Sequence, residues 1–226
     1  GPDILISGIE KQNQDFPEAF DYGMLHNCML YGENLASVLN NETMHEYLNE
    51  LISPTCIMYA YQSSSLDPGG GQNYGSRIHV DSPRFIKNYI TNLGVIFPLD
   101  DFTLENGATH YLKGSHHSDE VPDRDFFFEN SSRGVCNRGD MILFNARVFH
   151  AAGTNNSKDT RHSITINVCR SFMRQRFDFP KLISEDLLTN LDDNGKRFIG
   201  MNVRMPKSLD EFYLPEEERL YKPNQG

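Results

Sequence analysis

The 226-residue chain is poor in basic side chains: 21 Lys and Arg stand against 31 Asp and Glu, for a formal net charge of -10. Nucleic acids and anionic membrane surfaces are bound by clustered Lys and Arg. The charge therefore argues against a nucleic-acid or membrane partner. It is compatible with a small anionic ligand, because one buried Arg can bind a carboxylate inside an acidic protein.

The chain also lacks the cysteine patterns of redox or zinc motifs. Its four cysteines, Cys28, Cys56, Cys136 and Cys169, are scattered, with no Cys-x-x-Cys pair. We interpret them as isolated reduced thiols. No apolar run approaches the roughly 20 residues that span a bilayer, and no secretory signal peptide is visible. Together these absences predict a cytoplasmic protein.

No nucleotide-binding P-loop is present either. The stretch from Ser63 to Gly75 is rich in glycine, but a P-loop needs Gly-Lys-Ser/Thr at the start of a helix, and none follows. We interpret Gly69–Gly75 as part of a lid that excludes water from a neighbouring site.

Short strand patterns dominate the middle of the chain, where β-branched and aromatic runs alternate with turn residues. They predict a mainly β fold, a double-stranded β-helix (jelly roll) with flanking helices. We expect one domain over 1–226, with an N-terminal helical part at 1–54, a jelly-roll core at 55–175 and a C-terminal tail at 176–226. The expected strands are 56–61, 77–80, 89–99, 108–112, 134–136, 141–144, 147–150 and 161–172, and the expected helices are 34–52 and 181–200.

The motif His79-x-Asp81 is the first sequence pattern that indicates a metal site. In a strand, residues two apart point to the same face, so His79 and Asp81 would present an imidazole and a carboxylate side by side. His150, at the end of a later strand pattern, is the candidate third ligand. Two histidines and one carboxylate leave three coordination positions open, as in the facial triad of non-haem Fe(II) oxygenases. A bidentate 2-oxoacid and O2 could occupy those positions.

Arg161 lies eleven residues after His150, and Ser163 shares its strand face. An arginine with a neighbouring hydroxyl can hold a carboxylate by a bidentate ion pair and one further hydrogen bond. Arg161 and Ser163 are therefore candidates to bind the far carboxylate of 2-oxoglutarate, whose keto-acid end would chelate the iron.

Four segments occur together in a fixed order. They are Arg77-Ile-His-Val-Asp-Ser-Pro83, Glu105-Asn-Gly-Ala-Thr109 continuing to Lys113-Gly-Ser-His116, Gly139-Asp-Met-Ile-Leu-Phe144 leading to His150, and Arg161-His-Ser163. With them the chain resembles the phytanoyl-CoA dioxygenase-like family of Fe(II)/2-oxoglutarate-dependent oxygenases. The resemblance spans residues 55–175 and reaches the tail around Pro180–Leu214. The ordered combination is specific, although each segment alone is weak.

The resemblance implies His79, Asp81 and His150 on iron and Arg161 on 2-oxoglutarate. It also bears on the outcome of the reaction. Halogenases of the superfamily have Gly or Ala at the position of Asp81, which opens a site for chloride. The carboxylate here therefore favours hydroxylation or a related oxidation.

The chain departs from the family pattern at two positions. Many members have Pro before the Gly-Ser-His turn, where this chain has Lys113, and some bind 2-oxoglutarate through a Ser where this chain has Ala152. We expect Ser163, which fits an Arg-x-Ser pattern of the wider superfamily, and Gln62 to supply co-substrate contacts instead.

The implied reaction hydroxylates a small-molecule metabolite and releases succinate and CO2. Candidate substrate contacts near the expected metal site are Tyr61, Tyr74, Arg77, Arg84 and Thr109. Arg77 and Arg84 could pair with a substrate carboxylate or phosphate, or could be ordinary structural arginines. We favour a small polar metabolite over a CoA thioester, because no Lys/Arg cluster for the CoA phosphates is present.

Two other classes of protein stay open. A catalytically silent jelly-roll metabolite-binding protein would usually lose a metal ligand or the arginine, whereas this chain keeps all four residues. A cupin-like metalloenzyme that does not use 2-oxoglutarate would more often surround its metal with several histidines, and Arg161-His-Ser163 would have no evident role. The sequence indicates no oligomeric state, and residues 1–30 could form either a substrate lid or an interface.

Overall fold

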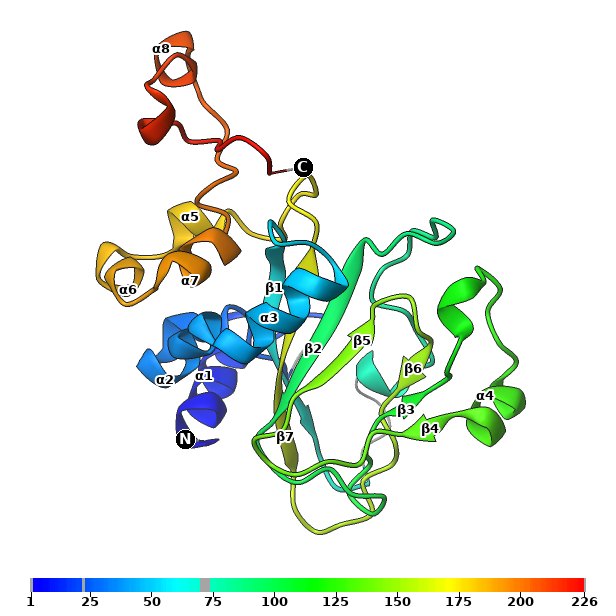
Figure 1. The fold of residues 1–226 in the computed structure, drawn as a ribbon. Helices are drawn as coiled ribbons and strands as arrows, with labels where there is room; N and C mark the ends of the chain where they lie inside the picture. Colours follow the sequence, from blue (N-terminus) through cyan, green and yellow to red (C-terminus); the bar gives the residue numbers. More distant parts are fainter. Residues whose placement is uncertain (1, 22, 70–73, 226) are drawn as a thin grey trace. The chain divides into compact units, whose positions relative to one another are not determined.

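A computed structural model describes residues 2–21, 23–69 and 74–225 (Figure 1). The chain divides into two compact units, one of Gly1–His26 with Tyr61–Asn167 and one of Asn27–Ala60 with Val168–Gly226. Every residue of the expected site belongs to the first unit. The expectation of a single domain over 1–226 stays a prediction.

The strands form two sheets. The four-stranded sheet has the order β1-β7-β2-β5, and the three-stranded sheet has the order β4-β3-β6. The bounds are β1 (Ile57–Leu66), β2 (Asn92–Pro98), β3 (His110–Tyr111), β4 (Ser132–Arg133), β5 (Ile142–Asn145), β6 (His150–Ala151) and β7 (Arg161–Cys169). This is the mainly β jelly-roll architecture with flanking helices that the sequence predicts.

Strand register brings the expected site residues toward one another. Within the four-stranded sheet, Gly94 lies opposite Phe144 in the antiparallel pair β2–β5. Within the three-stranded sheet, Tyr111 lies opposite His150 in the pair β3–β6. A separate bridge joins His79 to His150. The strand expected at 77–80 is therefore only this single bridge in an otherwise extended segment.

Two apolar clusters hold these strands in place. One is Ile96, Phe102, Ala108 and Phe144 with Tyr111, Cys136 and Ile142, and the other is Leu112, Phe127, Phe149 and Ala151 with Ile78, Val80 and Phe128. The second cluster includes both neighbours of His79, so burial of Ile78 and Val80 anchors the extended segment. Each fully buried Phe or Leu contributes about 1.5–3 kcal/mol to folding.

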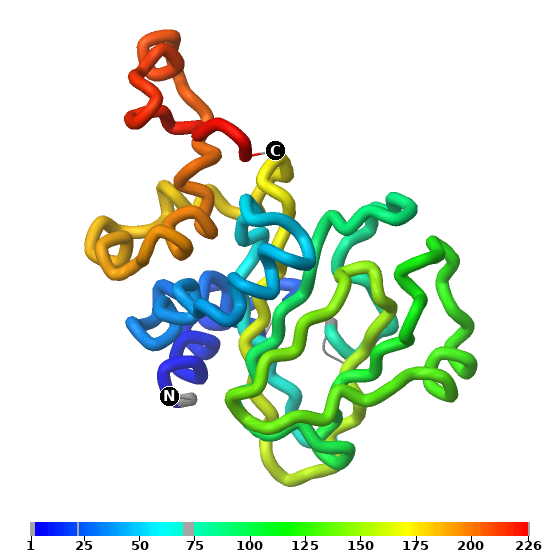
Figure 2. The backbone as a smooth tube through the Cα atoms, in the orientation of Figure 1, coloured from blue at the N-terminus to red at the C-terminus, as the bar shows by residue number. Residues whose placement is uncertain are grey.

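Two helices of the first unit were not expected. In α1 (Pro2–Asp15), the less exposed positions include Leu5, Gly8, Ile9 and Gln12, of which only Leu5 and Ile9 have apolar side chains, so the apolar repeat is weak. The green stretch of chain between β2 and β5 in Figure 2 carries α4 (Arg124–Asn130) as well as β3 and β4. The Asp123 side chain accepts hydrogen bonds from the first backbone amides of α4 and so caps it. This unit also contains two short 3-10 helices, η3 (Tyr74–Ser76) and η4 (Ser115–His117).

The helices of the second unit are shorter than the sequence pattern indicates. They are η1 (Cys28–Tyr31), α2 (Glu33–Ala36), η2 (Ser37–Asn40), α3 (Glu42–Leu51), α5 (Phe179–Leu182), α6 (Glu185–Thr189), α7 (Asp193–Phe198), α8 (Leu209–Phe212) and η5 (Glu216–Glu218). The helix expected at 34–52 is interrupted at Asn41, whose side chain caps α3. The helix expected at 181–200 is divided because Ser184 and Asp192 cap α6 and α7. No helix among the described residues is long and apolar enough to cross a membrane.

Candidate metal centre

Backbone hydrogen bonds set His79 beside His150. The amide of His79 donates to the carbonyl of His150, and the amide of His150 donates to the carbonyl of His79, both at 3.0 Å. The two imidazole rings lie with centroids 4.2 Å apart. Asp81 follows in the same extended segment, and its amide donates to the carbonyl of Ala146 at 2.9 Å. Two segments far apart in the sequence thus place all three side chains together.

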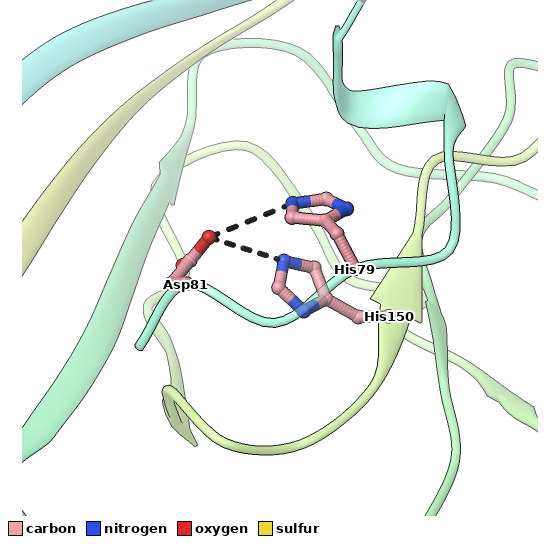
Figure 3. A group of neighbouring side chains, drawn as sticks. All are labelled: His79, Asp81 and His150. Carbon is pink, nitrogen blue, oxygen red and sulfur yellow. Dashed lines mark ion pairs between the residues drawn. The ribbon is translucent and has the colours of Figure 1, made fainter. Parts of the chain in front are cut away.

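The three side chains converge on one point (Figure 3). Oδ1 of Asp81 lies 3.5 Å from Nε2 of His79 and 3.7 Å from Nε2 of His150. The three candidate ligand atoms all lie within 4.8 Å of one another. Within the described parts of the chain, this is the only group of three or more His, Cys, Asp or Glu that could hold a metal ion.

Backbone carbonyls fix the orientation of both rings. The carbonyl of Arg77 lies 2.7 Å from Nδ1 of His79, and the carbonyl of Val148 lies 3.0 Å from Nδ1 of His150. A carbonyl can only accept, so in each ring Nδ1 carries the proton. The lone pair of Nε2 is then left facing the Asp81 carboxylate, which is the tautomer that a metal ligand requires.

The pKa values of the two histidines are shifted in opposite directions. Burial lowers the pKa of His79, but the hydrogen bond and negative charge of Asp81 outweigh it, so the pKa lies above 6.5. Burial also lowers the pKa of His150, and there it prevails over the attraction of Asp81. The carboxylate therefore favours positive charge at the point where the three ligand atoms meet. A divalent cation would supply it.

Arg161 is buried at the start of β7, with 3% of its surface exposed. Its Nη1 donates to the carbonyl of Gly107, and its guanidinium carbon lies 3.9 Å from the centre of the Phe102 ring. Gly107 has a φ of +80°, which explains the glycine of the Glu-Asn-Gly motif. Residue Arg161 takes part in none of the ion pairs found among the described residues.

Arg161 has the properties of an anion-binding residue. Its Nε is buried without a hydrogen-bond partner among the described residues. Burial lowers its pKa to about 10. A buried guanidinium without a counter-ion is unfavourable, so binding of a carboxylate would relieve a cost already present in the fold. The role of Arg161 toward 2-oxoglutarate stays a prediction.

Tyr111 packs against the metal-binding group, and the sequence did not predict this role. Its ring stacks on that of His150, with centroids 5.9 Å apart and an interplanar angle of 18°. Burial raises the pKa of Tyr111, the charge of Asp81 raises it further, and that of Arg161 lowers it. Both charges therefore lie close enough to the phenol to act on its pKa. The alternation that places Thr109 and Tyr111 on one strand face was the available signal.

The remaining co-substrate candidates lie on the same sheet as Arg161. Ser163 is buried, and its hydroxyl donates to the carbonyl of Ser64 at 3.2 Å. Gln62 lies on β1, where its backbone forms a bridge with His26. Their roles toward 2-oxoglutarate stay predictions.

The candidate substrate residues are dispersed. Tyr61 is buried and, as the neighbour of Gln62 on β1, points to the opposite face of that strand. Arg77 and Arg84 are exposed, and Thr109 is buried. The side chain of Tyr74 and residues 70–73 of the expected lid lie outside the described part of the chain. A substrate role for these residues stays a prediction.

A second buried arginine, Arg147, was also missed. Its Nη1 donates to the carbonyl of Ser82 at 3.1 Å, and its Nη2 donates to Oδ1 of Asp119 at 2.8 Å. The amide of Ser82 in turn donates to the carbonyl of Ala146 at 3.1 Å. Arg147 therefore fastens the segment that carries Asp81. Its sequence position, three residues before His150, gave no indication of these distant partners.

A jelly roll that presents two histidines and a carboxylate around one point has the architecture of non-haem oxygenases. Comparison with known families agrees. The phytanoyl-CoA dioxygenase (PhyH) family matches residues 10–163, more than half of the chain, and the chain belongs to this family.

The chain is also similar to individual proteins. The protein Rv1501 of Mycobacterium tuberculosis is 28% identical over 212 residues, covering 92% of this chain and 78% of that protein. The dioxygenase FrzG of a Cladobotryum species is 27% identical over 200 residues, covering 78% of this chain but only 63% of FrzG. The solved structure of the non-heme monooxygenase ThoJ matches with a TM-score of 0.58 at 15% identity, over 76% of this chain and 70% of ThoJ. At that identity the likeness to ThoJ concerns the fold.

Proposed function

We propose that this chain is an Fe(II)- and 2-oxoglutarate-dependent oxygenase that hydroxylates a small-molecule metabolite. The overall reaction consumes R–H, O2 and 2-oxoglutarate and yields R–OH, succinate and CO2. The observation that carries the proposal is the convergence of ligand atoms from His79, Asp81 and His150 within 4.8 Å. Arg161 is buried and forms no ion pair within the described part of the chain, which supports the choice of a carboxylate co-substrate.

The donor set fits iron(II). Two neutral imidazole nitrogens and one carboxylate oxygen are the ligands of the facial triad, and His79, Asp81 and His150 offer one such atom each. When bound, the iron would supply coordination positions for 2-oxoglutarate and O2 and the redox chemistry that activates O2.

The chain's own residues would orient the reactants and limit access of water. Arg161 and Ser163 would hold the far carboxylate of 2-oxoglutarate. The rings of Tyr111 and Phe144 pack against His150, stacked in one case and edge-on in the other. These apolar surfaces shield one side of the metal-binding histidine from solvent.

The first test needs no substrate. Fe(II) and then 2-oxoglutarate are added to the anaerobic protein, and the visible spectrum is recorded. A weak metal-to-ligand charge-transfer band should appear only with both present, and it should be lost in Asp81→Ala, in which one ligand atom is missing. The matched control is Asp159→Ala, which removes an exposed carboxylate and should leave the band unchanged.

A spectrum without the band, despite bound metal, would contradict the proposal. It would mean that 2-oxoglutarate does not chelate this site. The cupin-like metalloenzyme and the metabolite-binding protein would then become the better interpretations.

A further inference from the structure

The second half of strand β7 is buried on one face and only partly buried on the other. It lies between β1 and β2 in the four-stranded sheet. Ile164 and Ile166 are buried, whereas Thr165 and Asn167, which alternate with them, are only partly buried. Solvent therefore reaches this face of the strand at Thr165 and Asn167.

Side-chain hydrogen bonds show which residues share the open face. Nδ2 of Asn92 donates to Oδ1 of Asn167 at 3.0 Å, so these two side chains lie on one face. Oγ of Ser65 lies 2.9 Å from Nδ1 of His162, on the other face. By alternation along β1, Gln62 joins the Asn167 side. We call this side of the sheet the polar face; its members are Gln62, Ser64, Asn92, Ser163, Thr165 and Asn167.

The polar face is the one turned toward the metal-binding group. Gly94 lies two residues after Asn92 on β2 and so shares its face. A Cβ at Gly94 would meet the ring of Phe144. That ring packs edge-on against His150, with centroids 4.9 Å apart. The side chains of Asn92 and His150 thus lie on the same side of the sheet.

Asn92 carries a hydrogen-bonding atom that the described residues leave unused. The residue is 5% exposed, and its Oδ1 is buried with no hydrogen-bond partner among the described residues. Its backbone carbonyl accepts from the amide of Ala146 at 3.2 Å, and the carbonyl of Ala146 accepts from the amide of Asp81 at 2.9 Å. A buried carbonyl oxygen without a donor is unfavourable, and a donor on a ligand would satisfy it.

The two ends of the polar face are chemically distinct. Arg161 begins β7 and Asn167 lies six residues further along, about 20 Å at the usual rise of a strand. A 2-oxoglutarate molecule held at Arg161 is too short to reach Asn167. The end of the polar face at Asn92 and Asn167 therefore remains for the second reactant, which is the molecule to be oxidised.

We propose that Asn92 and Asn167 form a substrate subsite that accepts a hydrogen bond from a hydroxyl or amino group. The inference rests on the proposed function and assigns its substrate to the class of small molecules rich in such donors. Thr165 and Gln62, on the same face, would extend the polar surroundings. Long alkyl chains would leave Oδ1 of Asn92 buried and unpaired, and so would be disfavoured.

The test compares two sets of probes with the Fe(II)-loaded protein, 2-oxoglutarate and O2. The polar set is D-glucose, myo-inositol, L-serine and L-lysine, and the alkyl set is hexanoate, octanoate and decanoate. Succinate formation is measured against probe concentration. The variants are Asn92→Leu and Asn167→Val, each of which removes the amide at one of the two positions. The matched control is Asn130→Leu, at the C-terminal end of α4.

At least one polar probe should stimulate succinate formation. The concentration needed for half-maximal stimulation should rise at least about 10-fold in Asn92→Leu or Asn167→Val, as expected for loss of one buried hydrogen bond, and stay unchanged in Asn130→Leu. The anaerobic charge-transfer band should be present in every variant, because the band reports binding of 2-oxoglutarate and not binding of the substrate.

Stimulation by the alkyl set alone, by neither set, or equally in wild type and both variants would overturn the subsite. A missing band in the wild-type protein would instead overturn the proposed function, and the subsite with it.

Discussion

The ring of Phe144 packs edge-on against the ring of His150, with centroids 4.9 Å apart. Phe144 can occupy this position because residue 94, directly opposite on β2, is glycine. Any Cβ at position 94 would run into the Phe144 ring. A backbone position in the four-stranded sheet thereby controls the packing around a candidate metal ligand.

Gly94→Ala should displace Phe144 and disturb His150. Overpacking of this kind costs about 1–3 kcal/mol of stability, and we expect metal affinity to fall about 10-fold as His150 loses its packing partner. Titration with Mn(II) by calorimetry and chemical unfolding would measure both effects. The double variant Gly94→Ala/Phe144→Leu should recover part of each loss. Normal metal affinity in Gly94→Ala would show that the Phe144 ring does not support His150.

Arg161→Lys should raise the concentration of 2-oxoglutarate needed for the charge-transfer band. Lysine keeps the charge but loses the bidentate geometry of the guanidinium. We expect a 10- to 100-fold effect, on the order of 1.4–2.7 kcal/mol. Arg138→Lys, at an exposed position, is the control and should behave as wild type. An unchanged requirement in Arg161→Lys would mean that another residue binds the carboxylate.

Arg147→Met should loosen the segment that carries Asp81. The variant keeps the aliphatic stem but loses the hydrogen bonds to the carbonyls of Ser82 and Ser118. We expect a destabilisation of about 1–3 kcal/mol, seen in urea unfolding, together with weaker Mn(II) binding. Asp119→Asn should cost less than about 1 kcal/mol, because the Asp119 side chain is 66% exposed. Equal effects of the two variants would assign the role to the ion pair instead.

Stability should fall below neutral pH through His45. Its Nε2 lies 2.8 Å from the carbonyl of Leu39, and its Nδ1 lies 3.3 Å from Nη2 of Arg197, so the neutral ring donates to one and accepts from the other. Burial lowers the pKa of His45 below 6.5. The unfolded chain therefore takes up the proton first as the pH falls.

The stabilisation associated with neutral His45 is present above pH 6.5 and is lost as the pH falls toward the folded-state pKa, by up to about 1.4 kcal/mol per pH unit. Urea unfolding between pH 8 and pH 5 would show this slope. The variant His45→Gln should have a shallower slope than the wild type. Parallel slopes would exclude His45 as the source.

The candidate metal group was predictable because its spacing does not depend on details of the fold. His79 and Asp81 need only an extended backbone between them, and they stay on one side although the expected strand at 77–80 is a single bridge. His150 and Arg161 followed from the order of the motifs. The jelly-roll class followed from alternating runs such as β7, whose Ile164 and Ile166 are buried as expected.

The residues that support the site were not predictable, because their partners come from remote segments. Arg147 bonds to the carbonyl of Ser82, 65 residues away, and Asn92 bonds to Asn167, 75 residues away. Local sequence pattern carries no information on such pairs. Helix α1 was missed for a different reason: two of its inward positions are Gly8 and Gln12, whereas the apolar Ile4 and Ile6 are exposed, so the apolar repeat is weak.

The division of β7 into two unlike faces has a consequence for how such an enzyme can change. Alternate residues of β7 face the hydrophobic core and the proposed subsite, so mutations at Thr165 or Asn167 leave Ile164 and Ile166 in place. New molecules can be accommodated by altering every second codon of a short stretch while the neighbouring codons preserve foldability. A library of variants that are mutated only at those alternate positions would therefore sample different substrate preferences, and most of its members should still fold.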